Sequence, residues 1–201
     1  MIRVLLAEDQ GMVRGALAAL LQLEEDIEIV AEVARGDEVL AAALKSQPDV
    51  ALLDIEMPGG SGLDAAQALS KQLPACRIVI LTTFGRSGYL RQAMESGAVA
   101  FLLKDAPAAD LAVAIRRVMA GERVVDPELA LTALSEGQNP LTPREREVLV
   151  ASLSGASVAE IASQLVVSKG TIRNHLSEAI QKMRARNRFE AARLAQEKGW
   201  L

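Results

Sequence analysis

The sequence contains one cysteine, one histidine, one tryptophan, one tyrosine and three phenylalanines among its 201 residues. A single cysteine excludes an internal disulfide, and a single histidine without cysteine partners excludes a zinc site of the usual type. The scarcity of aromatic side chains argues against a surface on which bases stack. The apolar run Ile2–Ala7 is much shorter than the roughly 18 residues that cross a membrane. We therefore expect a cytoplasmic protein without direct membrane insertion.

Charge is distributed unevenly along the chain. The formal net charge is −4, and half of the residues are apolar, which suffices for two hydrophobic cores. Residues 1–139 contain 12 Lys and Arg against 20 Asp and Glu, whereas residues 140–201 contain 10 against 6. An acidic part joined to a basic part indicates that only the second meets a polyanion.

The first 120 residues alternate between short apolar runs and longer stretches of helical period. This alternation predicts βαβ crossovers and a five-stranded, parallel, doubly wound α/β domain. The predicted strands are Ile2–Ala7, Ile27–Val33, Val50–Asp54, Arg77–Thr82 and Val99–Leu103. The predicted helices are Met12–Leu23, Glu38–Ser46, Leu63–Gln72, Gly88–Ser96 and Leu111–Ala120.

The pattern changes after Gly121. Residues 121–139 are predicted to be a linker, with one short helix over Pro127–Ser135. Residues 140–201 form a small all-α domain, because capping signals precede its apolar periods at Thr142, Ser157, Ser168 and Asn187. Its four predicted helices are Pro143–Ser154, Val158–Leu165, Lys169–Arg184 and Arg188–Gln196.

Polar side chains follow four of the predicted strands. Glu8 and Asp9 follow the first, Asp54 ends the third, Thr82 ends the fourth and Lys104 follows the fifth. The carboxyl ends of parallel strands share one edge of the sheet, where ligands of such folds bind. Three neighbouring carboxylates repel one another unless a cation neutralises them. A hard divalent ion with oxygen ligands does so, which predicts Mg²⁺.

The same set of groups suits phosphoryl transfer. Asp54 is the candidate nucleophile, Lys104 the candidate cation and Thr82 the candidate hydroxyl donor to the phosphoryl oxygens. A lone carboxylate after a strand is commonly a helix cap, and a lone lysine there is commonly solvated. The prediction therefore depends on the whole set occurring in this order.

Residues 1–120 resemble the receiver domains of two-component response regulators, which have a flavodoxin-like fold. The resemblance lies in Glu8-Asp9, in the segment DIEMP from Asp54 with Gly62 after it, in ILTTF and in FLLKD. It implies that Asp54 is the phosphoacceptor and that a sensor histidine kinase is its donor. It also implies a metal site of Glu8, Asp9, Asp54 and the Glu56 carbonyl, phosphoryl contacts from Thr82 and Lys104, and a rotamer switch at Phe101.

Two of the C-terminal helices are separated by only three residues, Val166-Val167-Ser168. Such a short break is typical of helix-turn-helix units. The second helix has a core stripe of Ile172, Leu176, Ile180 and Met183. The side chains left outside this stripe suit phosphates and base edges. They are Ser168, Lys169, Thr171, Arg173, Asn174 and Ser177.

The segments LTPREREVL, AEIASQL, SKGTIRNHLSEAIQKM and NRFEA resemble the LuxR/GerE-type helix-turn-helix. Joined to a receiver, this resembles the NarL/FixJ family of response regulators, which are transcription factors. It implies base contacts from Arg173, Asn174 and Ser177, and phosphate contacts from Ser168, Lys169, Thr171 and Lys182. Phosphorylation is expected to promote dimerisation, and RNA polymerase is a further candidate partner. The motifs AEDQGM and LLQLEED are most similar to a subgroup that controls fatty-acid desaturase genes.

The sequence leaves alternatives open. The dimer surface is either the outer faces of Met12–Leu23 and Leu111–Ala120 or the face of Gly88–Ser96. An aspartyl-phosphate phosphatase would also use Asp54 and Mg²⁺, with Glu56 as a general acid two residues later. We expect no such enzyme, only stoichiometric phosphorylation and dephosphorylation of Asp54. A third reading is a binding module that works without phosphate, against which the set Asp9, Asp54, Thr82 and Lys104 speaks.

Overall fold

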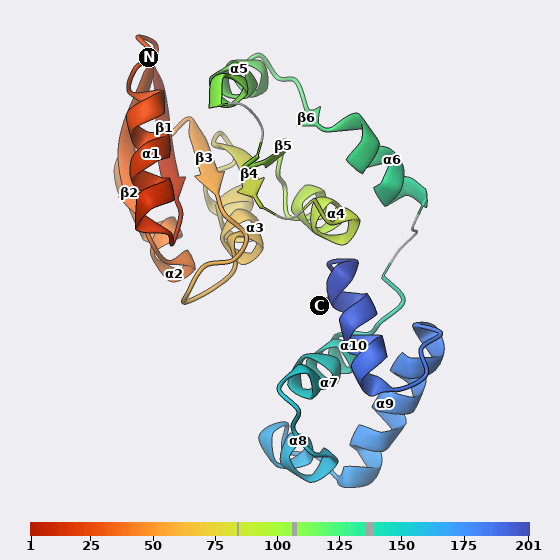
Figure 1. The fold of residues 1–201 in the computed structure, drawn as a ribbon. Helices are drawn as coiled ribbons and strands as arrows, with labels where there is room; N and C mark the ends of the chain where they lie inside the picture. The colour runs from red at the N-terminus through yellow and green to blue at the C-terminus, as the bar shows by residue number, and fades with distance from the viewer. Residues whose placement is uncertain (84, 106–107, 136–138) are drawn as a thin grey trace. The chain divides into compact units, whose positions relative to one another are not determined.

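A parallel sheet organises the N-terminal part of the chain, in a computed structural model that describes residues 1–83, 85–105, 108–135 and 139–201. Within these residues the strand order is β2-β1-β3-β4-β5-β6 (Figure 1). The doubly wound parallel fold is thereby confirmed. The order reverses beside β1, and open α/β sheets bind ligands at such a point. The strands are β1 (Ile2–Ala7), β2 (Ile27–Val33), β3 (Val50–Leu53), β4 (Arg77–Thr82), β5 (Ala100–Leu103) and β6 (Val124–Val125).

The sixth strand corrects the five-stranded prediction. β6 is two residues long, and its residues pair with Ala100 and Phe101 at the outer edge of β5. It lies within the segment predicted to be a linker, directly before α6 (Pro127–Ser135), whose bounds match the predicted short helix. Two residues are too few to show the period of two that marks a strand in sequence.

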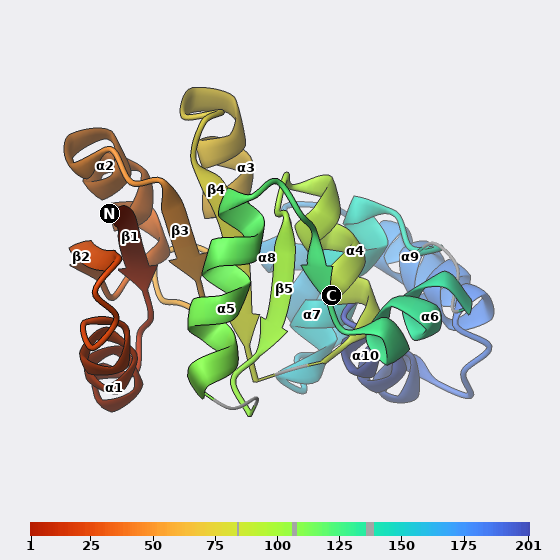
Figure 2. The same cartoon turned by 90° about the horizontal axis from the view of Figure 1, so that it is seen from above.

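Helices cover both faces of the sheet. Leu21 on α1 and Ile115 on α5 pack with Leu6, Leu52 and Leu81 in one core. Figure 2 shows α1 and α5 on the side of the sheet opposite α2 and α3. β3 is buried over its whole length, which explains its uninterrupted apolar sequence. The helices are α1 (Gly11–Leu21), α2 (Gly36–Ser46), α3 (Gly62–Gln72), α4 (Ser87–Glu95) and α5 (Ala108–Met119).

Residue contacts divide the chain into two compact units. The first comprises Met1–Gly85 and Leu90–Leu131, and the second comprises Arg86–Tyr89 and Thr132–Leu201. The second unit has its own core, in which Trp200 packs with side chains of four helices. The domain limits proposed at residues 120 and 140 stay predictions. The four helices around the core of the second unit are α7 (Pro143–Leu153), α8 (Val158–Gln164), α9 (Lys169–Lys182) and α10 (Arg188–Glu197).

The capping signals of the second unit act as the sequence predicts. The side chains of Thr142 and Ser157 each accept a hydrogen bond from the backbone N–H of the third helical residue, which is a glutamate in both helices. The glutamate side chain in turn accepts a hydrogen bond from the backbone N–H of the capping residue. Ser168 caps α9 and Asn187 caps α10. These contacts satisfy amide groups that a helix start otherwise leaves unpaired. In the described parts of the chain, no helix combines the length and the apolar character of a membrane span.

Candidate functional site

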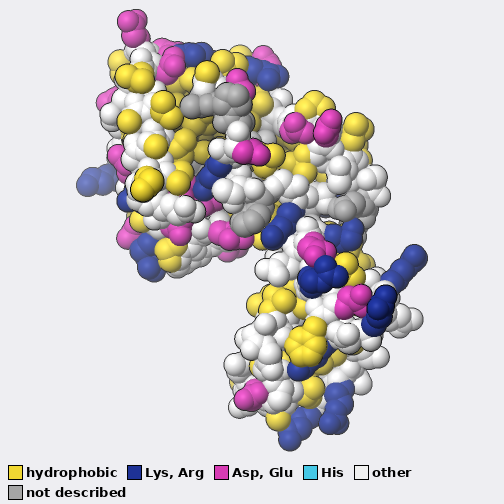
Figure 3. All heavy atoms as spheres, viewed as in Figure 1, with side chains coloured by type: hydrophobic (Ala, Val, Ile, Leu, Met, Phe, Trp, Pro, Cys, Tyr) yellow, Lys and Arg dark blue, Asp and Glu magenta, His cyan; other side chains and the backbone are white. Residues whose placement is uncertain are grey.

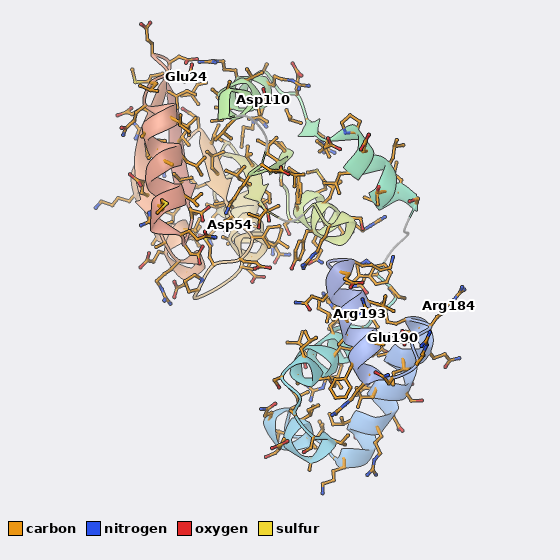
Figure 4. All side chains as sticks on the ribbon, in the orientation of Figure 1. Glu24, Asp54, Asp110, Arg184, Glu190 and Arg193 are labelled. Carbon is orange, nitrogen blue, oxygen red and sulfur yellow. The ribbon has the colours of Figure 1, made fainter. Side chains whose placement is uncertain are left out.

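Three carboxylates meet at the carboxyl edge of the sheet. Glu8 and Asp9 follow β1 and Asp54 follows β3, and one oxygen of each lies within 4.8 Å of the others. Figure 4 labels Asp54 at this end of the strands. Glu8 is 1% exposed and Asp54 is 6% exposed, whereas Asp9 is exposed to solvent. The fold thus brings together the side chains that the sequence placed at the ends of separate strands.

Lys104 completes this cluster from the end of β5. Its Nζ lies 2.6 Å from Glu8 Oε2 and 2.9 Å from Asp54 Oδ2, and its side chain is 9% exposed. Burial opposes the charge of Lys104, but the hydrogen bonds to Glu8 and Asp54 outweigh burial and raise the pKa of Lys104 above its ordinary value. Lys104 is therefore a fixed cation at neutral pH, positioned beside the Asp54 carboxylate.

Main-chain amides orient the same carboxylates. Asp54 Oδ1 accepts a hydrogen bond from the Ile55 N–H at 2.7 Å, and Glu8 Oε1 accepts one from the Gln10 N–H at 3.2 Å. The Asp54 N–H donates to the Ala7 carbonyl, which ties the end of β3 to the end of β1. Asp54 therefore presents its second oxygen to Lys104 in a defined orientation.

Two glycines shape the loop that follows Asp54. A side chain at Gly62 would place its Cβ 1.9 Å from the Asp54 carbonyl oxygen, and one at Gly36 would place it 2.0 Å from the Gly60 carbonyl oxygen. The Gly36 N–H also donates to the Pro58 carbonyl at 3.0 Å. This close backbone packing fixes the segment that contains Glu56, whose side chain is exposed. No hydrogen bond to the Glu56 carbonyl occurs among the described residues, so its role as a metal ligand stays a prediction.

Thr82 and Phe101 lie on neighbouring strands and on the same face of the sheet. Phe101 pairs with Ile80, and Thr82 pairs with Leu103, so Thr82 and Phe101 are diagonal neighbours. Both side chains are buried to 1% exposure. The register therefore places the two predicted switch residues close enough for a movement of one to affect the space of the other. That such a movement takes place stays a prediction.

In the second unit, α8 and α9 form a helix-turn-helix. Ile172, Leu176 and Ala179 are buried on the inner side of α9. Lys169, Arg173, Asn174 and Ser177 are exposed, as predicted for side chains that contact DNA. Figure 3 shows dark blue side chains at the lower end of this unit, where α9 begins.

The side chains of Ser168 and Thr171 have a structural role at the start of α9. Ser168 Oγ accepts the Thr171 N–H at 3.0 Å and lies 2.9 Å from the Thr171 hydroxyl. In the turn before them, Val166 adopts a left-handed backbone with φ 54° and is 89% exposed. Left-handed backbone is unusual for a β-branched residue, so Val166 holds a strained position beside the start of α9.

Lys182 has a partner within the protein. Its Nζ lies 2.7 Å and 2.8 Å from the two carboxylate oxygens of Glu145, which is completely buried. The Thr142 N–H donates to the same carboxylate at 2.8 Å. Burial opposes ionisation of Glu145, but the hydrogen bonds from Lys182 and Thr142 outweigh it and lower the pKa of Glu145. The predicted phosphate contact of Lys182 would thus compete with an internal ion pair that joins α7 to α9.

Comparison with known proteins identifies both units. Residues 4–116 match the family described as "Response regulator receiver domain", and residues 139–195 match "Bacterial regulatory proteins, luxR family". The chain is a response regulator of the NarL/FixJ family. A receiver joined to a LuxR-type DNA-binding domain makes this response regulator a transcription factor.

Relatives of similar length support this identification. Over the whole chain, the response regulator is 48% identical to the transcriptional regulatory protein YvfU of Bacillus subtilis, described as uncharacterized, and covers all of it. It is 46% identical to the transcriptional regulatory protein DesR of the same organism, again over the whole chain and 99% of the relative. Among solved structures, the response regulator ChrA of a heme-sensing two-component system is 32% identical, with a TM-score of 0.58 over 100% of this chain and 98% of that one.

A structure of the two-component response regulator RcsB in complex with DNA has the same fold. It is 24% identical to this response regulator, with a TM-score of 0.66 and 98% coverage of each chain. At this level of identity the likeness concerns the fold alone.

Sequence reasoning missed the tertiary contacts of three residues of this response regulator. Gly36 lies far from Gly60 in the sequence, and the buried Glu145 has the same local pattern as the exposed capping residue Glu160. Arg14 contacts the backbone of Glu8, although it was not singled out. One signal could have drawn attention to Arg14, because it is the only charged residue in the otherwise apolar α1.

Proposed function

We propose that phosphorylation of Asp54 by a sensor histidine kinase switches this response regulator from a weakly to a tightly DNA-binding state. The observation that supports this most directly is the position of the Asp54 carboxylate between the ammonium of Lys104 and the acidic pair Glu8-Asp9. In this step an Asp54 carboxylate oxygen attacks the phosphorus of a phosphohistidine and forms a P–O bond. The P–N bond breaks, and the imidazole of the kinase histidine leaves with the electron pair and takes up a proton from water. The product is a stoichiometric aspartyl phosphate rather than a product released at each turnover.

The residues of the pocket have separate tasks in this transfer. Lys104, charged at neutral pH, neutralises charge on the phosphoryl oxygens, and the Ile55 amide holds Asp54 Oδ1 in place. Thr82, at the end of the neighbouring strand, is the proposed hydroxyl donor to the phosphoryl group. We propose that its movement toward that group changes the space open to Phe101, and that β5 transmits the change to β6 and α6 through the Phe101–Val125 pair.

The same pocket fits a magnesium ion. Three carboxylates and one ammonium leave a formal charge of −2, and their oxygens are hard ligands at mutual distances that one ion can span. Glu8, Asp9 and Asp54 would hold Mg²⁺, together with the predicted Glu56 carbonyl. When bound, the ion would neutralise charge on the phosphoryl oxygens and orient them.

Dimerisation is the proposed consequence in the receiver. Large apolar side chains are exposed at Met12 and Leu20 on α1 and at Val113 and Met119 on α5. The two helices contact each other on the same face of the sheet, and Figure 3 shows hydrophobic side chains gathered over the α1 region. Of the dimer surfaces that the sequence left open, these exposures favour the α1 and α5 face.

A dimer would place two α9 helices on successive half-sites of DNA about one helical turn apart. Arg173, Asn174 and Ser177 are the proposed base contacts because they form the exposed side of α9. Lys169, Ser168 and Thr171 are the proposed phosphate contacts at its N-terminus. Contact with RNA polymerase stays a prediction. Control of fatty-acid desaturase genes also stays a prediction, which transcript levels in a deletion strain would test.

The position of Glu56 does not support the phosphatase alternative. Its side chain is exposed, and the described carboxylate cluster consists of Glu8, Asp9 and Asp54 without it. Steady turnover of a phosphomonoester, rather than one phosphoryl group per chain, would support that alternative.

The proposed function is tested with acetyl phosphate and Mg²⁺ as phosphoryl donor and cofactor. Wild type and Asp54→Ala are compared by intact-mass measurement, by sedimentation and by binding to a DNA fragment from the protein's own promoter. We expect one phosphoryl group, a dimer and tighter DNA binding for the wild type alone. Labelling and dimerisation of Asp54→Ala at the wild-type level would refute the proposal.

A further inference from the structure

Arg14 is the single charged residue of α1, and its guanidinium is only partly exposed because it contacts other parts of the protein. Its Nη1 donates to the Glu8 carbonyl oxygen at 2.6 Å and lies 3.5 Å from the Asp9 carbonyl oxygen. Its Nε lies 3.8 Å from Glu32 Oε2 on β2, and the side chain is 24% exposed. The guanidinium therefore joins α1, β2 and the segment that contains two of the pocket carboxylates.

The contacts of Glu8 show what this arrangement does. The Glu8 N–H donates to the Val33 carbonyl at the end of β2, and Arg14 binds the Glu8 carbonyl on the other side. Gln10, the residue that caps α1, makes no side-chain capping bond among the described residues. Arg14 thus helps to fix the connection between β1 and α1, together with the Glu8 carboxylate that accepts the Gln10 N–H.

Arg14 differs from Lys104 in the oxygens that it uses. Lys104 binds the carboxylate oxygens of Glu8 and Asp54, which are the atoms a metal ion would need. Arg14 instead binds the peptide carbonyl oxygens of Glu8 and Asp9. Its positive charge, which Glu32 partly balances, would repel a divalent cation, so the contribution of Arg14 to cation binding is the position in which it holds the Glu8–Asp9 backbone.

We propose that Arg14 is a positioning residue that holds Glu8 and Asp9 in the arrangement that binds a divalent cation. This rests on the proposed function, because the cation acts in the phosphorylation of Asp54. Groups that orient metal ligands typically change metal affinity by roughly 10- to 100-fold when they are removed. Since Arg14 is partly exposed, we expect about tenfold weaker Mg²⁺ binding for Arg14→Gln, the lower end of that range.

The test uses the full chain and two measurements. Isothermal titration with Mg²⁺ gives the dissociation constant directly, without phosphorylation. Labelling by acetyl phosphate over a range of Mg²⁺ concentrations gives the half-saturating concentration and the limiting rate separately. For Arg14→Gln we expect the dissociation constant and the half-saturating concentration to rise together by about tenfold, with a limiting rate within about twofold of wild type.

Two further variants separate positioning from folding. Arg117→Gln is the matched control, because Arg117 also pairs from a helix with a surface glutamate, Glu122, and should leave Mg²⁺ binding unchanged. Arg14→Lys keeps the charge but can donate to fewer carbonyls, and we expect an intermediate dissociation constant. If Arg14→Gln fails to fold, as judged by thermal unfolding without Mg²⁺, the Arg14→Lys comparison decides.

The outcomes distinguish this inference from the proposed function. A Mg²⁺ dissociation constant of Arg14→Gln, or of Arg14→Lys where that comparison decides, within about twofold of wild type would overturn the positioning role even if Asp54 is labelled normally. A lower limiting rate with unchanged Mg²⁺ affinity would overturn it as well. Absence of labelling in the wild type would contradict the proposed function, while the titration would still measure the effect of Arg14. Absence of Mg²⁺ binding by the wild type would overturn both.

Discussion

The ion pair between Glu145 and Lys182 allows a quantitative prediction for the DNA-binding unit. Lys182→Met removes both hydrogen bonds from Lys182 to the Glu145 carboxylate and leaves the one from the Thr142 amide. Removing one partner of a fully buried pair costs roughly 3–5 kcal/mol. The Lys182 side chain is 34% exposed, so water reaches the pair, and we expect a loss of about 2 kcal/mol in the free energy of unfolding.

Trp200 provides the assay for this variant. It is the only tryptophan of the chain, and it is buried in the core of the second unit, so its fluorescence follows the unfolding of that unit. A loss of about 2 kcal/mol lowers the urea midpoint by roughly 1 M when the slope is 1–3 kcal/mol per molar. The control is Arg193→Ala, which breaks an exposed pair with Glu197 and should cost less than about 1 kcal/mol.

The pH dependence of the same variant has a defined sign. Because the pKa of Glu145 is lowered in the folded protein, the pair stabilises the fold above the ordinary glutamate pKa of about 4.3. This contribution is lost as the pH falls through the lowered value. The stability difference between wild type and Lys182→Met should therefore narrow below about pH 4. Glu145→Gln combined with Lys182→Met should recover part of the loss, because neither partner is left charged and unpaired. A midpoint of Lys182→Met equal to that of the Arg193→Ala control would refute this reasoning.

Three other substitutions have expected outcomes. Gly36→Ala should destabilise the receiver by more than about 2 kcal/mol, because the new Cβ would lie 2.0 Å from the Gly60 carbonyl oxygen. Thermal unfolding followed by circular dichroism measures this, and an unchanged unfolding midpoint would contradict it. Val166→Gly should stabilise the second unit by up to about 1 kcal/mol in the Trp200 urea assay, because a left-handed backbone costs a β-branched residue more than it costs glycine. A lower urea midpoint than wild type would contradict strain at Val166. Arg173→Ala should weaken binding to the cognate DNA by about 1–3 kcal/mol, measured by gel shifts at two salt concentrations. The urea midpoint reported by Trp200 should stay unchanged. An affinity equal to that of wild type would remove Arg173 from the base contacts.

Local signals in the sequence determined the elements of the fold and the members of the candidate pocket. Apolar runs and helical periods depend on neighbouring residues, so five strands and ten helices lie where the sequence placed them, within three residues at their ends. The caps at Thr142 and Ser157 are contacts over three residues, which explains why they were predictable. The pocket followed from one topological rule, because parallel strands deliver their carboxyl ends to one edge.

Only the tertiary structure decided which charges meet. Lys182 pairs with Glu145 across 37 positions of the sequence, and no local pattern separates this lysine from one that contacts phosphate. The position of Gly36 against Gly60 and the pairing of β6 with β5 also depend on packing between distant segments.

The contact of Arg14 with the Glu8 backbone spans only six residues, but it requires the turn between β1 and α1 to bring the helix back over the strand end. The sequence therefore named the carboxylates of the pocket, because chemistry selects their residue types. The groups that hold those carboxylates in place act through backbone atoms that every residue has, and only the folded chain shows where these atoms lie.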